Sequence, residues 1–199
     1  MPPSIEFWFE FASTYSYLAA SRIEKLAHAA GVVIVWRPFL LGPLFKAQGW
    51  NDSPFNVYPV KGRYMWRDME RLCERYGLPL CHPTQFPRNG LLAARIVVAG
   101  DGAGWVPAFV RNVYRANFGD DRDVADRTVL ETLLRDVGTD PVAVLRDADS
   151  QPVKDHLRAS TEQAQRLGIF GAPSFVVRGE LFWGNDRLEE ALEWATSHS

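Results

Sequence analysis

The stretch "FEFASTYSYLAA", residues 9 to 20, contains the point at which a strand is expected to pass directly into a helix. Ahead of that point, apolar and acidic residues alternate over residues 5–11, which predicts a strand with Glu10 among the polar residues of its outer face. Beyond it, apolar residues recur at helical spacing until Gly31, a residue suited to a helix C-cap. Ser13 therefore lies at the junction, where the first backbone N–H groups of a helix have no partner within the helix.

The next segment completes a βαβ unit. Residues 32–39, "VVIVWRPF", are β-branched and short, which predicts a second strand. The intervening helix is too long for a hairpin connection, so the two strands are expected to be parallel neighbours. Residues 42–56 are rich in Gly, Pro, Asn and Asp, and we predict a loop there, with a helical turn at "LFKAQ", residues 44–48.

The rest of the chain divides into a helical block and a closing ββα unit. Helical periodicity returns repeatedly between residues 60 and 167, in segments separated by Gly, Pro and Asp. Residues 174–177 and 180–183 flank Arg178-Gly179 and predict a hairpin, followed by a last helix over residues 187–197. The order β-α-β, helices, β-β-α predicts an α/β fold of thioredoxin-like architecture. We predict one unit, 1–199, with a core formed by 1–41 and 167–199 and an all-helical insertion, 42–166.

Composition favours a small-molecule partner. The 199 residues are 47% hydrophobic, enough for a full core, and the net charge of -2 gives no field that would attract nucleic acid or an anionic membrane. No apolar run approaches the roughly 18 residues of a membrane span, and no signal sequence is recognised, so we expect a cytoplasmic protein. Cys73, Cys81 and the scattered histidines lack metal-ligand spacing, and we expect no metal.

Three local patterns suggest a binding site, and each has a plainer alternative. Ser13 could donate a hydrogen bond to a thiolate brought by a cosubstrate, or it could only cap the helix. In "GIFGAPSFVV", residues 168–177, Ala172-Pro173 is a candidate cis peptide bond. Beside it, the Ala172 backbone could pair with an extended peptide-like ligand; the alternative is an ordinary turn proline.

The third pattern is "FWGNDRL", residues 182–188. Asn185 or Asp186 is expected to be the N-cap of the last helix, whose free N–H groups would suit a small carboxylate. An acidic side chain at that place could also bind an ammonium group. Capping alone is the alternative.

Together these patterns resemble a known family. "FEFASTYSYLA", "FGAPSFVV" and "WGNDRL" resemble the 2-hydroxychromene-2-carboxylate isomerases and, more distantly, the kappa-class glutathione transferases. These proteins share the fold of the disulfide-bond oxidoreductases but carry serine in place of the first cysteine. The resemblance extends from about Glu6 to Leu192 and includes "LFKAQGWNDSP", "YMWRDMERLCERYGLPL" and "FPRNGLLAAR".

The resemblance implies glutathione as cosubstrate. It places Ser13 opposite the glutathione sulfur, Ala172 against the cysteinyl backbone, and the residues that follow the hairpin around the γ-glutamyl end. On the substrate side it implies a lysine that could hold a carboxylate and stabilise charge on the adjacent oxygen. The implied glutathione residues are Ser13, Ala172, Trp183, Gly184, Asn185 and Asp186, and the implied substrate residues are Lys46, Asn51, Asn56 and Phe86.

The expected activity is therefore a glutathione-dependent ring-opening and cis-trans isomerisation of an aromatic carboxylate such as 2-hydroxychromene-2-carboxylate, in aromatic catabolism. A kappa-like transferase or peroxidase is one alternative, and a glutathione or peptide-binding module without chemistry is another. Thr14 stands where the family usually has proline, and Phe86 where a relative carries tyrosine. Both departures leave the physiological substrate open, and the sequence leaves the oligomeric state open, a homodimer included.

Overall fold

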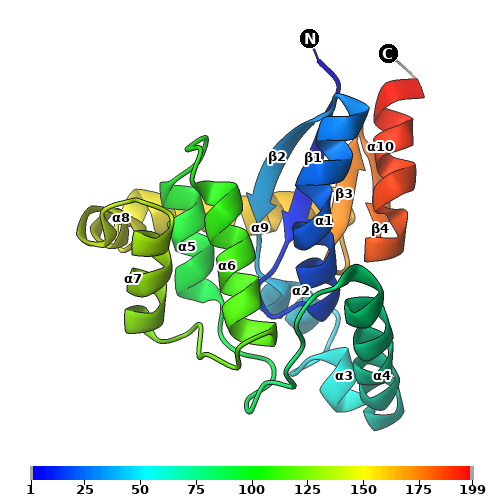
Figure 1. Ribbon diagram of the computed structural model, residues 1–199, viewed down its shortest axis with the longest axis horizontal. Coiled ribbons are helices and arrows are strands. Elements are labelled where there is room, and N and C mark those ends of the chain that lie inside the picture. Colours follow the sequence, from blue (N-terminus) through cyan, green and yellow to red (C-terminus); the bar gives the residue numbers. More distant parts are fainter. Residues whose placement is uncertain (1, 198–199) are drawn as a thin grey trace.

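The computed structural model describes residues 2–197. The ends of the predicted unit, Met1, His198 and Ser199, lie outside the described residues. The chain forms a small sheet with helices on both of its faces and a group of helices at its side, so the predicted thioredoxin-like α/β architecture is confirmed (Figure 1).

The sheet has four strands in the order β2-β1-β3-β4. The strand β1 lies at its centre, parallel to β2 and antiparallel to β3, with Phe7 opposite both Trp36 and Phe175. The expected parallel pairing across α1 is confirmed. The bounds are β1 Ser4–Phe9, α1 Thr14–Ala30, β2 Val33–Pro38, β3 Ser174–Val177 and β4 Glu180–Trp183.

The predicted hairpin closes through Arg178 and Gly179. Their φ angles are 52° and 86°, so both central turn residues have positive φ. Such turns match the right-handed twist of the strands that they connect. The hairpin brings the chain back so that β4 ends close to the start of β3, with Ser174 opposite Trp183.

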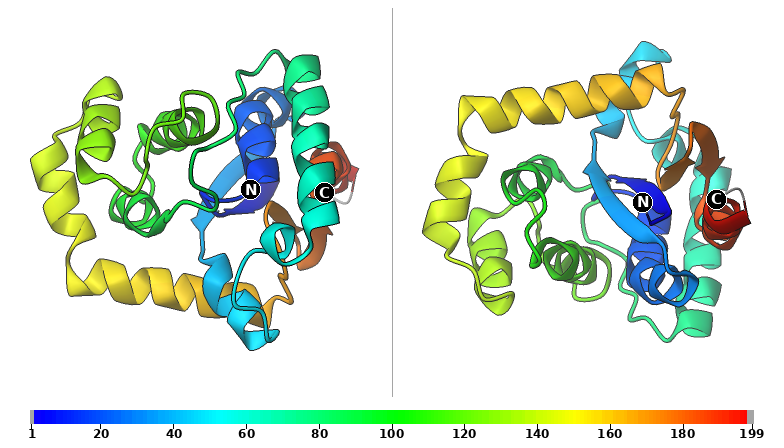
Figure 2. Two further views of the ribbon diagram at one scale, coloured as in Figure 1. Left: turned by 90° about the horizontal axis from the view of Figure 1, so that it is seen from below. Right: turned by 90° about the horizontal axis from the view of Figure 1, so that it is seen from above.

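Both faces of β1 are buried. On one face, Phe7 and Phe9 pack in a large core with α1 and with α10, Leu188–Ser197. On the opposite face, Trp8 lies in a smaller cluster with Ala164 of α9, Gln151–Arg166. Helix α9 and α1 lie on opposite sides of the sheet (Figure 2). A sheet covered on both faces explains why Trp8 interrupts the alternation of apolar and acidic residues in this strand.

The helical block contains the helices that periodicity predicts. A group at the side of the sheet is connected to the core through the large hydrophobic cluster, which includes residues of both (Figure 1). Another helix, α4, lies beyond the end of the sheet where β1 meets α1. The bounds are α4 Pro59–Tyr76, α5 Leu91–Ala99, α6 Val106–Phe118, α7 Arg127–Asp136 and α8 Pro141–Ala148. Within residues 2–197, no helix is long and apolar enough to cross a membrane.

The loop predicted for residues 42–56 is wrong in part, because two short helices occupy much of it. Helix α2 spans Leu41–Ala47 and buries Leu44 in the smaller cluster. Helix α3 spans Pro54–Val57, with Ser53 accepting a hydrogen bond from the Phe55 N–H as its N-cap. Helices this short show no full apolar period, so the Gly, Pro and Asn residues around them dominated the pattern.

Candidate functional site

Ser13 connects the start of α1 to the loop before β3. Its backbone is extended, and its Oγ accepts a hydrogen bond from the Ser16 N–H at 3.2 Å, so Ser13 is the N-cap of the helix. The same hydroxyl donates to the Ala172 carbonyl oxygen at 2.8 Å. Two segments separated by 159 positions in the sequence thus meet at one hydroxyl group.

The loop that contains Ala172 adopts the predicted geometry. The Ala172-Pro173 peptide bond is cis, as expected. The Gly184 N–H donates to the Pro173 carbonyl at 3.0 Å, and the Ser174 hydroxyl donates to the Gly171 carbonyl at 2.9 Å. These bonds hold the loop beside the residues that follow β4.

The segment after β4 differs from its prediction. Neither Asn185 nor Asp186 is a helix N-cap. Both lie within a 3-10 turn, Asn185–Arg187, that starts after Gly184 and has no side-chain cap. The Gly184 φ of 114° is one that side chains disfavour, and it gives the turn its start. The N-cap prediction was wrong because the turn begins through the backbone conformation of Gly184 and needs no side chain as a cap.

The side chains of Trp183, Asn185 and Asp186 differ in how far they are exposed. The Asn185 side chain is buried, and its Oδ1 accepts a hydrogen bond from Arg22 Nη1 at 3.0 Å. The Asp186 side chain is 77% exposed. Trp183 is 52% exposed and packs its ring against Phe170, with centroids 4.9 Å apart. Asp186 and Trp183 are therefore open to a ligand, whereas the Asn185 side chain is used within the fold.

A single cleft of about 1730 Å³ joins these segments to the helices beyond the sheet. It brings together nine of the ten residues that the sequence suggests: Ser13, Lys46, Asn51, Phe86, Ala172, Trp183, Gly184, Asn185 and Asp186. Asn56 is the exception. Its Nδ2 donates to the Asp52 carboxylate at 3.1 Å and to the Phe86 carbonyl at 3.3 Å, which ties two loops together outside the lining.

The cleft lining also combines aromatic walls with an exposed cation. Phe45 and Trp50 pack against each other with ring centroids 5.7 Å apart, and Phe86 adds a further aromatic surface. Lys46 is exposed on α2 and has no ion pair among the described residues. A flat aromatic anion matches this combination of surfaces.

A tyrosine of the lining is fixed by a carboxylate. The Tyr15 hydroxyl donates to Asp68 Oδ2 at 3.0 Å. Burial, followed by the negative charge of Asp68, raises the pKa of this phenol well above its ordinary value. Tyr15 therefore lines the cleft as a neutral hydroxyl whose proton already has an acceptor.

Glu10 is a cleft residue that the alternation pattern placed wrongly. Strand β1 ends at Phe9, so the two-residue period no longer applies at Glu10, and its side chain turns inward, where it is 9% exposed. Burial raises the pKa of its carboxyl to about 7, despite the Ala12 N–H that donates to Oε2 at 2.8 Å. The alternation continues to Phe11, so the sequence pattern does not show that the strand ends at Phe9. The only nearby signal is Ser13, a residue typical of a helix N-cap.

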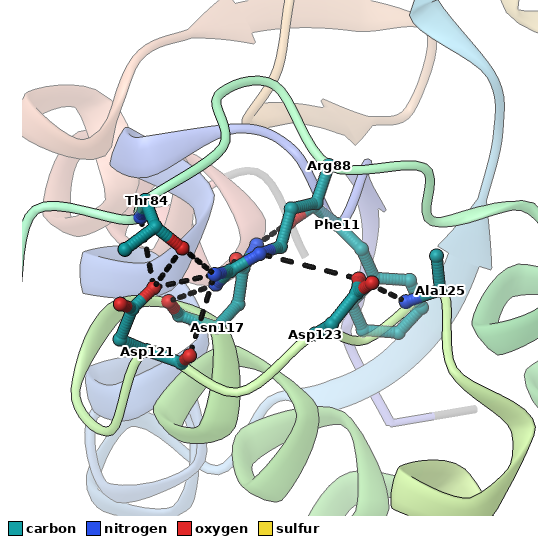
Figure 3. Close-up of polar contacts among 7 residues, drawn as sticks. All are labelled: Phe11, Thr84, Arg88, Asn117, Asp121, Asp123 and Ala125. Carbon is teal, nitrogen blue, oxygen red and sulfur yellow. Dashed lines mark hydrogen bonds and ion pairs between the residues drawn. The ribbon is translucent and has the colours of Figure 1, made fainter.

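A buried arginine holds the β1–α1 connection from the side of the helical block (Figure 3). Arg88 is 5% exposed, and its Nη1 donates to the carbonyl and side-chain oxygens of Asn117, each at 3.1 Å. Asn117 Nδ2 in turn donates to the Phe11 carbonyl at 3.1 Å. Arg88 also pairs with Asp121, whose pKa is lowered first by the Thr84 N–H and then by this guanidinium. The chain of bonds fixes the peptide two residues before Ser13.

Comparisons with known proteins agree with this geometry. A family model described as the DSBA-like thioredoxin domain matches residues 4–193, which sets the class of the protein. A solved 2-hydroxychromene-2-carboxylate isomerase structure superposes with a TM-score of 0.86, at 27% identity, over 96% of this chain and 93% of that one.

Curated relatives narrow the class further. The 2-hydroxychromene-2-carboxylate isomerase of Sphingobium xenophagum is 35% identical over 190 residues, which cover 95% of this chain and 96% of the relative. The chain belongs to the 2-hydroxychromene-2-carboxylate isomerase family. Human glutathione S-transferase kappa 1 is more distant, at 24% identity over 95% of this chain and 89% of its own. Both resemblances that the sequence motifs suggest are thereby confirmed.

The described residues also bear on metal binding. Residues 2–197 contain no group of three or more His, Cys, Asp and Glu side chains placed to hold a metal ion. Cys73 is buried and Cys81 exposed, and both are free thiols. The expectation that the protein works without a metal stays a prediction.

Proposed function

We propose that the protein is a glutathione-dependent isomerase that interconverts 2-hydroxychromene-2-carboxylate, or a close aromatic relative, with its open-chain trans isomer. Membership of the isomerase family supports the reaction class. The observation that carries the glutathione part is the bond from Ser13 to Ala172 in the wall of the cleft.

That bond suggests how glutathione binds. The Ser13 hydroxyl has one proton, which it gives to the Ala172 carbonyl in the free protein. An extended cysteinyl N–H could take over as donor to that carbonyl, as an added strand does at a sheet edge. The Ser13 hydroxyl would then be free to turn to the glutathione sulfur and stabilise its thiolate, assisted by the positive end of α1.

The exposed end of the same wall suits the γ-glutamyl group. The Asp186 carboxylate is open to solvent within the cleft and could pair with the γ-glutamyl ammonium. Trp183, half exposed beside it, offers apolar surface to the peptide. Asn185 would act through its buried bond to Arg22, which fixes the turn.

Lys46 and the aromatic walls would hold the substrate. The Lys46 ammonium could bind the substrate carboxylate and stabilise the oxygen that gains negative charge as the ring opens. Asn51 lines the same region and could add a neutral donor, and Phe86 offers a face for the aromatic ring.

The reaction then follows from reversible addition. The ring first opens: the hemiketal hydroxyl of the substrate loses its proton and becomes a ketone as the ring C–O bond breaks, and the phenolic oxygen that leaves takes up a proton. The glutathione thiolate then adds to the double-bond carbon β to this ketone, the π electrons move to the ketone oxygen, and the former double bond becomes a single bond. Rotation about that bond and expulsion of the thiolate give the trans isomer. Glutathione is regenerated, so no net oxidation or conjugation occurs. The need for reduced glutathione suits the expected cytoplasmic location.

The test follows both substrate and glutathione. Purified protein is incubated with 2-hydroxychromene-2-carboxylate with and without glutathione, and isomer ratio and total free thiol are measured over time. We expect isomerisation that requires glutathione and leaves the thiol concentration constant. Parallel incubations replace the chromene with a halonitrobenzene or a peroxide. Loss of thiol to a conjugate with the halonitrobenzene, or to glutathione disulfide with the peroxide, together with no chromene turnover, would indicate a transferase or peroxidase instead. Tight glutathione binding without any turnover would indicate a binding module.

A further inference from the structure

Glu10 is a buried carboxyl group in the wall of the same cleft. It lies three positions before Ser13, lines the cleft with it, and is nine-tenths buried. Its backbone is fixed on two sides, because its carbonyl accepts hydrogen bonds from the Tyr114 hydroxyl at 2.8 Å and from the Ser13 N–H at 3.0 Å. The carboxyl group is therefore held in place by the element that also positions Ser13.

The carboxyl group has no charged partner. Its hydrogen bond is the one from the Ala12 N–H to Oε2, and no arginine, lysine or histidine in residues 2–197 forms an ion pair with it. Tyr114 of α6 and Arg88 of the segment before α5 are ionisable residues near this loop. Tyr114 donates to the Glu10 carbonyl, and Arg88 pairs with Asp121. A buried carboxylate without a partner is costly to keep for structural reasons alone.

The backbone of Gly90 lies close to the other oxygen of the carboxyl group. A side chain at Gly90 would begin 2.7 Å from Phe11 Cβ and 3.4 Å from Glu10 Oε1. Gly90 also lines the cleft. One carboxylate oxygen is thus engaged with the backbone, while the other lies beside a position without a side chain.

We propose that Glu10 is the acid–base group of the isomerisation, accepting the glutathione thiol proton and delivering it to the substrate oxygen. The proposal rests on the proposed function, because it assigns a step of that reaction. Its geometric basis is that the Glu10 carboxyl group lines the same cleft as Ser13, accepts a hydrogen bond from the Ala12 N–H, and has no ion-pair partner within residues 2–197.

The proton balance is simple. Glu10 takes the proton from the glutathione sulfur, which keeps the electron pair as thiolate. When the thiolate forms the C–S bond and the π electrons move to the substrate oxygen, that oxygen takes the proton from Glu10. After rotation the oxygen returns the proton to Glu10, the double bond re-forms and the C–S bond breaks. The thiolate and the protonated carboxyl group are then ready for the next substrate.

The environment suits this role. A carboxyl group whose pKa is raised by burial to about 7 is close to half ionised at neutral pH, so it can both accept and donate a proton. An ordinary carboxyl would be too weak a base toward a thiol. Ser13 has no titrating group in this range and cannot exchange the proton in its place.

The test compares Glu10→Gln with Glu6→Gln in the full-length protein. Glutamine keeps the shape and an acceptor for the Ala12 N–H but cannot titrate. Glu6 lies on β1, four positions before Glu10 and outside the cleft lining, where its carboxylate accepts hydrogen bonds from Trp8 and Arg37. For each protein, glutathione affinity is measured by calorimetry, and chromene turnover by its pH profile. Glu10→Asp, which keeps a titrating group, is included as a conservative variant.

We expect Glu10→Gln to lose roughly 10² to 10⁴ in turnover and the inflection near pH 7, with glutathione affinity within about threefold. Glu6→Gln should match the wild type, and Glu10→Asp should retain a pH inflection. If the wild type isomerises chromene and Glu10→Gln has the same rate and pH profile, the Glu10 role is overturned while the proposed function stands. If the wild type needs no glutathione or has no turnover, the proposed function fails, and this assignment fails with it.

Discussion

At the scale of single residues, Ser13 has two structural bonds and one proposed chemical role. It caps α1 through Ser16 and binds the Ala172 carbonyl. The two possibilities that the sequence leaves open, helix cap and thiol ligand, are therefore compatible, and the cap is confirmed. A substitution of Ser13 should therefore have two effects that can be measured separately: one on the free energy of unfolding and one on the pKa of bound glutathione.

Ser13→Ala should destabilise the fold by about 1 kcal/mol, the usual cost of a lost N-cap. It should also raise the pKa of bound glutathione by roughly 1 to 2, because the thiolate loses a charge-assisted hydrogen bond. Thiolate absorbance titrated against pH measures the second effect. As a control, Asp126→Ala removes the N-cap of α7 outside the cleft and should leave the thiol pKa unchanged. An identical titration in Ser13→Ala and the wild type would rule out the thiol role.

Lys46→Met should lower chromene turnover by about a hundredfold while glutathione affinity stays within about twofold, because one positioned cation is lost from the substrate side. Steady-state kinetics and calorimetry measure the two quantities. Lys25→Met, on α1 outside the cleft lining, is the matched control and should behave as the wild type. Full chromene turnover in Lys46→Met would remove Lys46 from the mechanism.

Because the Glu10 carboxyl group is buried, we also expect the stability of the fold to depend on pH. Its pKa is raised on folding from 4.5 to about 7, so the stability that it contributes as a neutral acid is present below pH 4.5 and is lost as pH rises toward 7. Relative to wild type, Glu10→Gln should gain up to about 3 kcal/mol of unfolding free energy between pH 4.5 and 8. Urea unfolding at both pH values measures the gain. A difference that does not vary with pH would mean that the carboxylate is not buried as described.

At the scale of elements, residue periodicity located the long helices, but it was less accurate for short helices and for the ends of strands. The strands, the hairpin and the helices of the middle region follow from two- and 3.6-residue patterns. Helices α2 and α3 are too short for that signal, and Glu10 lies just past the end of a strand whose last residue no local pattern marks. The hydrogen bonds from Arg88 to Asn117 and from Asn117 to Phe11 join segments that are distant in sequence, so no local sequence pattern predicts them.

Asn117→Ala should lower the unfolding free energy by about 1 to 3 kcal/mol, because the Phe11 carbonyl and Arg88 Nη1 lose a buried partner. Turnover should fall further than the stability loss requires, since the Phe11 peptide positions Glu10 and Ser13. The control is Asn112→Ala on the same helix; within residues 2–197 the Asn112 side chain forms no hydrogen bond, so its loss should matter by less than about 0.5 kcal/mol. Equal stability of the two variants would show that the buried network does not hold this loop.

At the scale of the whole molecule, the cleft exists because four distant regions meet beyond one end of a small sheet. Its lining comes from the β1–α1 junction, the cis-proline loop with the turn after β4, the helices α2 to α4 with the segments that join them, and residues 85–91. Motif resemblance placed nine of ten candidate residues in this cleft. Asn56 lies outside the lining, where its amide donates to Asp52 and to the Phe86 carbonyl, and its role stays a prediction. Glu10 was missed because burial, unlike residue type, depends on the assembled fold.

The most direct measurement is a crystal structure of the protein with glutathione, since the sulfur position tests Ser13, Ala172 and Asp186 together. The account predicts the sulfur within hydrogen-bond distance of Ser13 Oγ, about 3.5 Å or less allowing for the size of sulfur, the cysteinyl backbone paired with Ala172, and the ammonium group at Asp186. Glutathione bound with its sulfur away from Ser13, or outside this cleft, would contradict it.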